Sequence, residues 1–312
     1  MNTQSNAIKQ SPLEPQGIGP APAVIPATRL LYWSLRRELW ENRYIYLAPL
    51  IAGAVFLFSF LISLAYLPGK MRAAAALDPL KQRELIQQPY FFAAALIMVT
   101  AFIVGIFYCL DALYGERRDR SILFWKSLPV SDLTTVLAKL SIPVVLIPLL
   151  SFAIAVVTQW IMLLLSSVVL LGSGLSVGTL WTQSSFLHVS LLLLYHIVTV
   201  HGLWYAPIYG WLLLVSAWAP RAPFMWAFLP PFVIYGVEKI AFNSSHFLAM
   251  LQHRLTGPDV SIPMMPGGTV MDEMAALTPA LFFSTPGLWI GLAIAAAFIA
   301  AAVRLRRYRG PI

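Results

Sequence analysis

Long apolar stretches, separated by short polar segments, make up most of the chain. A helix needs about 20 predominantly apolar residues to cross a bilayer, and six stretches of this kind follow one another. They are Tyr44–Leu67, Tyr90–Leu110, Ile142–Leu171, His188–Trp218, Pro223–Val237 and Pro286–Val303. The pattern therefore predicts an all-α integral membrane protein with six transmembrane helices within residues 44–303.

Two of these stretches contain residues that disturb a regular helix. The fifth is the weakest, because only Ala222–Val237 is free of charge and the pair Pro230-Pro231 interrupts it. In the fourth, Pro207 cannot continue the hydrogen-bond ladder and Gly210 adds backbone freedom. We therefore predict that the fourth transmembrane helix bends near these two residues.

The segments around the spans predict the remaining elements. Residues 1–28 are rich in Pro, Gly and Gln, which is typical of a disordered tail. In residues 29–43 a leucine stripe lies roughly opposite several arginines, so we expect an amphipathic helix in the membrane interface. The loop 238–285 is expected to form short helices that dip into the interface on the other side. Residues 304–312 form a basic tail.

The predicted interfacial helix carries aromatic and basic side chains outside its leucine stripe. The two tryptophans fall nearer the arginines than the leucines, so their rings could face a protein partner. The alternative is a simple basic anchor that precedes the first span. The residues concerned are Trp33, Arg36, Arg37 and Trp40.

Composition and charge agree with a membrane protein and orient it. Only 11% of the residues are charged and 59% are hydrophobic, whereas soluble domains carry about 25% charged residues. The net charge of +8 could suggest nucleic acid. However, fifteen of the 21 Lys and Arg residues fall on the side of the two termini and six on the other side. This bias places both termini in the cytosol and makes the lipid bilayer, not nucleic acid, the expected partner.

The sequence contains no complete motif for nucleotide binding, nucleophilic catalysis or zinc binding in the structural setting that such a motif requires. The only Gly-Lys pair, Gly69-Lys70, lacks the rest of a phosphate-binding loop. Gly174–Gly178 matches GxSxG by letter, but it joins two predicted transmembrane helices rather than a strand and a helix. The single Cys109 and the lack of HExxH remove the usual zinc signatures. We expect no catalytic site, no metal site and no cofactor in this chain.

The fourth predicted span contains the polar residues of most interest. On an α-helix His188, His196 and His201 lie about 80° and 140° apart, so they should not converge on one ion. Histidines that pack or line a cavity are therefore favoured over metal ligands. Together with Tyr205 and Tyr209, His196 and His201 form a possible substrate path, and aromatic packing is the alternative.

The predicted cytosolic loop 111–140 is the most distinctive segment. Its stretch ERRDRSILFWKSLPVSD contains seven of the 34 charged residues in the chain. Ser121–Leu128 can form about two helical turns, which Pro129 would end, and Ser131 or Asp132 can cap the next helix. Exposed Phe124 and Trp125 rings would favour a covering partner. The alternative is that these rings lie on lipid headgroups.

This stretch resembles the cytosolic loop of bacterial type-2 ATP-binding-cassette exporter permeases. Leu203–Pro231, LWYAPIYGWLLLVSAWAPRAPFMWAFLPP, is similar to permeases of the same group, and the likeness extends from about Thr28 to the C-terminus. The resemblance implies that Ser121–Leu128 is a coupling helix and that Arg29–Tyr44 is an elbow helix. Many relatives have Gly where this chain has Arg120. The resemblance therefore does not specify the conformation of the turn before the coupling helix.

The resemblance also implies partners and a location. The expected assembly contains two permeases, identical or paired, and two separate ATPase subunits, which bind ATP and Mg. Its expected location is the bacterial inner membrane. The residues implied in ATPase docking are Arg120, Ser121, Phe124, Trp125 and Leu128. The substrate stays unidentified. Two other classes of protein are alternatives. One is a secondary transporter or channel without an ATPase partner. The other is an intramembrane enzyme, although this sequence shows no converging nucleophile and base.

Overall fold

The computed structural model describes residues 27–127, 130–184, 186–257 and 279–312, which are helical with no strand. Most of the predicted N-terminal tail, and Leu128, lie outside the described residues. The first half of the chain forms α1 (Ala27–Glu41), α2 (Tyr44–Ser63), η1 (Leu64–Tyr66), α3 (Leu67–Ala74), α4 (Pro79–Ala112), α5 (Tyr114–Arg118), α6 (Ile122–Ser127) and α7 (Asp132–Ser141). The second half forms η2 (Ile142–Leu146), α8 (Ile147–Gly172), α9 (Gly178–Ser184), α10 (Phe186–His196), η3 (Ile197–Trp204), α11 (Ala206–Trp218), α12 (Pro223–Phe242), α13 (His246–Thr256), α15 (Pro279–Ser284) and α16 (Pro286–Tyr308).

Five helical stretches are long and apolar enough to cross a membrane. They are Tyr44–Ala74, Pro79–Arg118, Asp132–Gly172, Pro223–Phe242 and Pro286–Tyr308. A sixth candidate is the pair Ser190–Trp204 and Ala206–Trp218. By length and composition, these six correspond to the six predicted stretches. The prediction of a helical protein with several helices long and apolar enough to cross a membrane is therefore confirmed.

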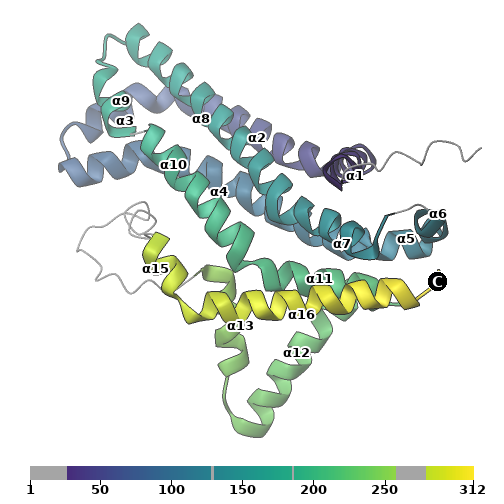
Figure 1. Cartoon of the computed structure of the whole chain (residues 1–312). Helices are drawn as coiled ribbons and strands as arrows, with labels where there is room; N and C mark the ends of the chain where they lie inside the picture. Colours follow the sequence, from purple (N-terminus) through teal and green to yellow (C-terminus); the bar gives the residue numbers. More distant parts are fainter. Residues whose placement is uncertain (1–26, 128–129, 185, 258–278) are drawn as a thin grey trace, which may run out of the picture.

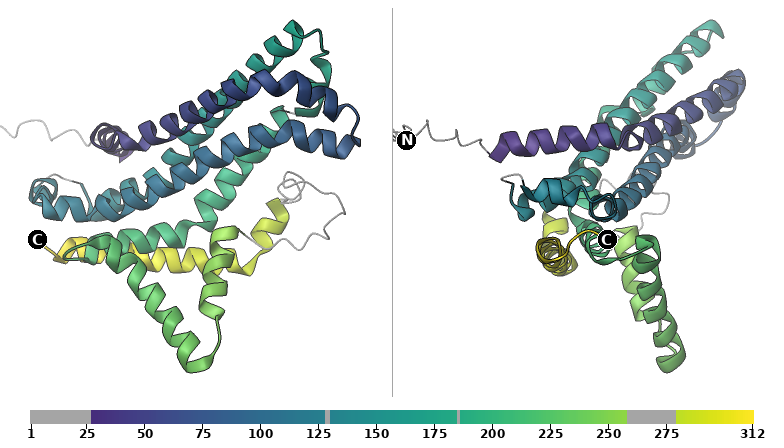
Figure 2. Two further views of the ribbon diagram at one scale, coloured as in Figure 1. Left: turned by 180° about the vertical axis from the view of Figure 1, so that it is seen from behind. Right: turned by 90° about the vertical axis from the view of Figure 1, so that its right-hand side faces the viewer.

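The long helices pack in two groups. In one, α2, α4 and α8 lie against one another, and in the other α11 lies along α16 (Figures 1 and 2). The groups meet where α11 also contacts α4. The largest apolar cluster forms at this contact and includes the buried side chains of Tyr108, Tyr209 and Leu213. These inward residues fix how α4 and α16 lie relative to α11.

The predicted bend in the fourth span is present. The two helical parts differ in direction by 47°, and the break lies at Tyr205, two residues before Pro207. The preceding segment η3 is π-helical, and the N–H of Tyr205 bonds to the carbonyl of Val200 at 2.9 Å. A proline in the first turn of α11 needs no donor there, so the helix can restart in a new direction.

The fifth span is longer than predicted and projects from the rest of the bundle. The helix α12 continues through the two prolines to Phe242, and α13 returns beside it as a hairpin (Figure 1). The carboxylate of Glu238 holds the turn, because it accepts the N–H groups of His246 at 2.6 Å and Phe247 at 2.9 Å. The predicted short helices of the loop 238–285 are present as α13 and α15, while residues 258–278 lie outside the described part.

Candidate functional site: a polar junction at one end of the bundle

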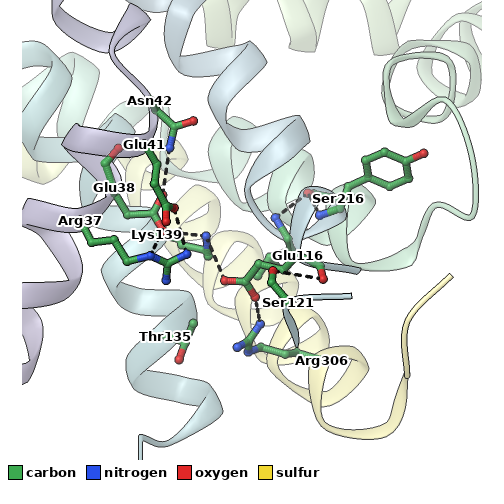
Figure 3. Close-up of polar contacts among 12 residues, drawn as sticks. Arg37, Glu38, Glu41, Asn42, Glu116, Ser121, Thr135, Lys139, Ser216 and Arg306 are labelled. Carbon is green, nitrogen blue, oxygen red and sulfur yellow. Dashed lines mark hydrogen bonds and ion pairs between the residues drawn. The ribbon is translucent and has the colours of Figure 1, made fainter. Parts of the chain in front are cut away.

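Four elements far apart in the sequence meet at the end of the bundle that carries α1 and α6. They are α1, α5, α7 and the last turns of α16 (Figures 1 and 3). Each contributes charged side chains to one contact network, which we call the junction. Its members are Glu38, Glu116, Asp132, Lys139 and Arg306.

Charges alternate along the junction. The ammonium of Lys139 lies 2.8 Å from a Glu38 oxygen and 3.3 Å from a Glu116 oxygen. The other Glu116 oxygen accepts a hydrogen bond from Arg306, and Arg306 lies 3.2 Å from Asp132. Four of the five side chains are at most 7% exposed, and Asp132 is 21% exposed. The junction thus ties α1 to α7, α7 to α5, and α5 to α16 through buried ion pairs.

Neutral donors complete the environment of Glu38. The hydroxyl of Tyr108 donates to its second carboxylate oxygen at 2.9 Å, and the amide of Asn42 donates to the same oxygen at 3.2 Å. Burying charges in an apolar bundle is costly unless they are paired and hydrogen-bonded. Because both conditions hold, the buried side chain of Glu38 can fix the position of α1.

A second set of hydrogen bonds explains the break between α4 and α5. The hydroxyl of Ser216 donates to the carbonyl of Leu110 at 2.8 Å and accepts the N–H groups of Leu113 and Tyr114 at 3.0 and 2.9 Å. Beside it, Arg117 donates to the carbonyl of Ala217 at 2.7 Å. A cation at these last carbonyls suits the negative end of α11. The loop that leads to α6 is thereby attached to α11.

The short helix α6 is present as predicted, and its side chains differ in exposure. Ile122 points inward, whereas Leu123 and Phe124 are each 59% exposed. The ring of Trp125 is half-buried, because the guanidinium of Arg37 lies 3.5 Å from its centroid. Lys126 donates to two backbone carbonyls beyond α16 and at its end, each at 3.3 Å. The outward apolar pair is therefore Leu123 and Phe124, while Trp125 joins α6 to α1.

The turn before α6 has a left-handed residue at its centre. Arg120 has a φ of 59°, a region that glycine occupies at little cost. Arg120 is exposed and Ser121 half-buried. At the following helix Ser131, not Asp132, is the cap, since its hydroxyl accepts the N–H of Thr134 at 3.0 Å.

The helix α1 presents two different faces. Trp33 and Trp40 are 51% and 68% exposed, and Arg36 lies over the Trp33 ring. Arg37 forms a bidentate pair with Glu41, at 2.6 and 2.9 Å. The opposite face carries Leu35 and Leu39, which pack on the apolar core, and Glu38, which enters the junction. The predicted amphipathic helix is therefore present, with an unpredicted buried carboxylate on its inner face.

The histidines of the fourth span lie closer than the sequence suggested. The ring centroids of His196 and His201 are 5.8 Å apart, and those of His201 and Tyr205 are 5.1 Å apart. The expected 140° separation is wrong because η3 is π-helical, so residues five positions apart lie nearly above one another. Tyr209 is instead part of the apolar core, 6.3 Å from the Phe102 ring. The side chain of His188 lies outside the described part of the structure.

In the described ranges, no three His, Cys, Asp or Glu side chains are grouped so that they could hold a metal ion. Comparison of the chain with protein-family models, curated proteins and solved structures gives no match. The geometry of the junction and of α6 is therefore the main guide to function beyond the sequence resemblance.

Proposed function

We propose that this chain is the permease subunit of a bacterial type-2 ATP-binding-cassette exporter, and that α6 is its coupling helix. Apolar helices sufficient for six spans and the sequence of Glu116–Asp132 support this reading. The observation that carries it is the presentation of α6, whose exposed Leu123 and Phe124 lie on a helix tied to two other elements. An exposed aromatic on a fixed helix suits a protein partner.

The proposed mechanism is mechanical. An ATPase subunit that binds α6 would move α1 through the contact of Arg37 with Trp125. It would move the end of α16 through the hydrogen bonds of Lys126. The loop next to α6 would act on α7 and α16 through Glu116, because its two oxygens contact Lys139 and Arg306. Movement of one short helix would thus reach the first, third and sixth spans together. In this role α1 is the elbow helix.

The remaining parts of the proposal concern the assembly. ATP and Mg bind to the partner ATPase, and this chain supplies no group to hydrolysis. Two permease subunits, identical or different, and two ATPase subunits form the exporter in the inner membrane. Both termini then lie in the cytosol, on the same side as α6.

Co-purification tests the proposal. The full chain, tagged and extracted in a mild detergent, should retain an ATPase subunit that carries a phosphate-binding loop, and the complex should hydrolyse ATP in proteoliposomes. Recovery of the chain alone from membranes that contain such an ATPase, together with unchanged ATPase activity on mixing, would refute the assignment.

The paired histidines favour one second candidate, a secondary transporter. Two imidazoles 5.8 Å apart on a π-helical segment could exchange a proton during transport. This candidate requires transport in proteoliposomes that is driven by an ion gradient in the absence of ATP. The exporter proposal requires that such a gradient alone drives no transport.

A further inference from the structure

A second polar site lies at the opposite end of the bundle from the junction. Here the last turn of α13 contacts Trp204, at the end of η3, the following Tyr205, and the first turn of α16. Figure 1 shows α13 beside α16. Gly287 and Arg306 are 19 residues apart on α16, which corresponds to about 28 Å along a helix. The two sites therefore occupy different ends of the same helix.

The side chain of Arg254 is held at this site from several sides. Its guanidinium lies 4.4 Å from the centroid of the Trp204 ring, and it donates to the carbonyl of Gly287 at 3.2 Å. A Cβ atom at Gly291 would lie 1.3 Å from the same guanidinium, so only a glycine leaves room for it. The neighbouring carbonyl of Leu255 accepts from Tyr205 at 2.8 Å, which fixes the end of α13. The cation is thus preorganised.

Arg254 differs from the cations of the junction in the partners that the described residues give it. Lys139 and Arg306 each contact carboxylates, whereas Arg254 has no carboxylate partner among the described residues. A guanidinium has five N–H donors, and the described residues offer this one only the Gly287 carbonyl. Burial lowers the pKa of Arg254, and no carboxylate in the described ranges offsets that effect. A half-buried guanidinium is therefore left with unused donors.

The indole of Trp204 adds a second unused donor. Its ring is fully buried, and its N–H has no hydrogen-bond partner within the part of the chain that the structure describes. Leaving a buried donor unpaired is unfavourable, and this one belongs to the ring that Arg254 covers. A single acceptor with several lone pairs could satisfy both side chains.

The geometry points to a binding site for an oxyanion, a carboxylate or phosphate group, formed by Arg254 and Trp204. Guanidinium groups bind such anions through two parallel hydrogen bonds. The site is bordered by apolar side chains, because Trp204 packs in one cluster with Phe282 and Leu288. The expected ligand is therefore an amphipathic molecule that has a carboxylate or phosphate group attached to an apolar part. If the bound anion is the transported substrate, that part of the inference rests on the proposed function, whereas binding itself does not.

Dodecyl phosphate binding to the purified full chain in dodecyl maltoside tests the site. The wild-type chain should bind dodecyl phosphate and not dodecyltrimethylammonium, as measured by ligand-induced thermal stabilisation. Arg254→Gln should weaken binding about tenfold or more, because a charge-assisted bidentate contact is lost. Lys239→Gln removes an exposed cation from α12 and is the matched control that should bind normally.

Trp204→Phe keeps an aromatic ring beside Arg254 but removes the indole N–H together with part of the ring volume, so it should reduce affinity about threefold or more. The melting temperature of the unliganded variant reports separately what the lost volume costs in stability, because Trp204 is fully buried. This variant separates ligand binding from a purely anchoring role of Arg254, even where Arg254→Gln folds poorly. If inorganic phosphate competes with dodecyl phosphate, the site binds free oxyanions. If it does not compete, the site requires an oxyanion on an apolar chain. Either outcome supports the site. Wild-type affinity in Arg254→Gln and Trp204→Phe, or no binding to the wild-type chain, would overturn it. Neither result depends on an ATPase, so failure here leaves the exporter proposal standing.

Discussion

Lys139 and Glu38 are 101 residues apart in the sequence, yet their charged atoms lie 2.8 Å apart inside the junction. This contact attaches α1 to the start of the third span. Without it, α1 would be held there mainly by its leucines and by the contact of Arg37 with Trp125. The pair therefore adds a buried ionic contact to those that already attach α1 to the bundle, among them the hydrogen bond from Tyr108 to Glu38.

The first prediction concerns this pair. Lys139→Met leaves two buried carboxylates without their shared cation and should destabilise the protein by about 3 kcal/mol, since breaking a buried ion pair is strongly destabilising. Glu38→Gln should cost less, because Lys139 keeps Glu116. The double variant should lose less stability than the sum of the single losses. Thermal unfolding in detergent measures all three, and additive losses would contradict the coupling.

The second prediction concerns the left-handed turn. Arg120→Gly should stabilise the protein by about 0.5–1 kcal/mol, because glycine adopts a φ of 59° without the steric cost of a side chain. Arg120→Val should destabilise it by more than about 1 kcal/mol, since a β-branched residue tolerates this region poorly. The same unfolding assay compares the variants. A loss of stability in Arg120→Gly would show that the arginine side chain has a stabilising role that the turn does not explain.

The spans and the bend could be predicted from the sequence because each signal is local. An apolar run identifies its own helix, and Pro207 marks the restart of the fourth span by its own geometry. The short helix α6 was predictable for the same reason, as Pro129 stands two residues after its last residue in the sequence. The N-terminal boundary of α13 was not marked as clearly, since it depends on Glu238 folding back onto the N–H groups of His246 and Phe247.

The junction could not be predicted, because its partners are distant in the sequence. Glu116 and Arg306 are 190 residues apart, and nothing in either segment specifies the other. From the sequence, Lys139 is only one of the fifteen basic residues that place the termini in the cytosol, and Glu38 has no predicted role. The contact of His196 with His201 was missed for another reason: an angle of 100° per residue does not apply to a π-helix. The exposed pair on α6 also differs from the prediction of Phe124 and Trp125, because Arg37 covers the Trp125 ring and Leu123 is exposed instead.

The third prediction concerns the close approach at Gly291. Gly291→Ala should displace the guanidinium of Arg254 and loosen α13, which should cost roughly 1 kcal/mol relative to Gly236→Ala. Gly236 is the matched control, since it also lies within a helix but has nothing within 4 Å of the added atom. Thermal unfolding gives the difference, and limited proteolysis reports the release of α13. Equal stability of the two variants would contradict the observed packing of Arg254.

The fourth prediction concerns topology. Fifteen of the 21 Lys and Arg residues lie on the side of the termini, and basic residues are retained in the cytosol. A reporter fused after Ile312 should therefore be active when it requires the cytoplasm and inactive when it requires export. The reciprocal reporter inserted in the loop after α13 is the control. Activity of the Ile312 fusion only outside the cytoplasm would reverse the orientation and remove α6 from the reach of an ATPase.

The last prediction concerns the exposed face of α6. Replacing both Leu123 and Phe124 by Ala should leave the protein as stable as the wild type, because both side chains are more than half exposed. ATPase docking should weaken by about 2 kcal/mol, or roughly 30-fold in affinity, if these residues are the apolar centre of the contact. Substrate export should fail, and ATP hydrolysis should fall or become uncoupled from transport.

Trp125→Ala and Phe58→Ala distinguish docking from other effects. Trp125→Ala should lower stability as well as docking, because its ring lies under Arg37 and joins α6 to α1. Phe58 is 68% exposed and lies 14 residues after the start of α2, which is about 21 Å along that helix from its end next to α1. Phe58→Ala should therefore change neither quantity. Pull-down of the ATPase subunit with each purified variant provides the measurement. If α6 merely lay on lipid headgroups, the Leu123 and Phe124 double variant would recover the ATPase and transport substrate like the wild type, and the coupling role of α6 would have to be abandoned.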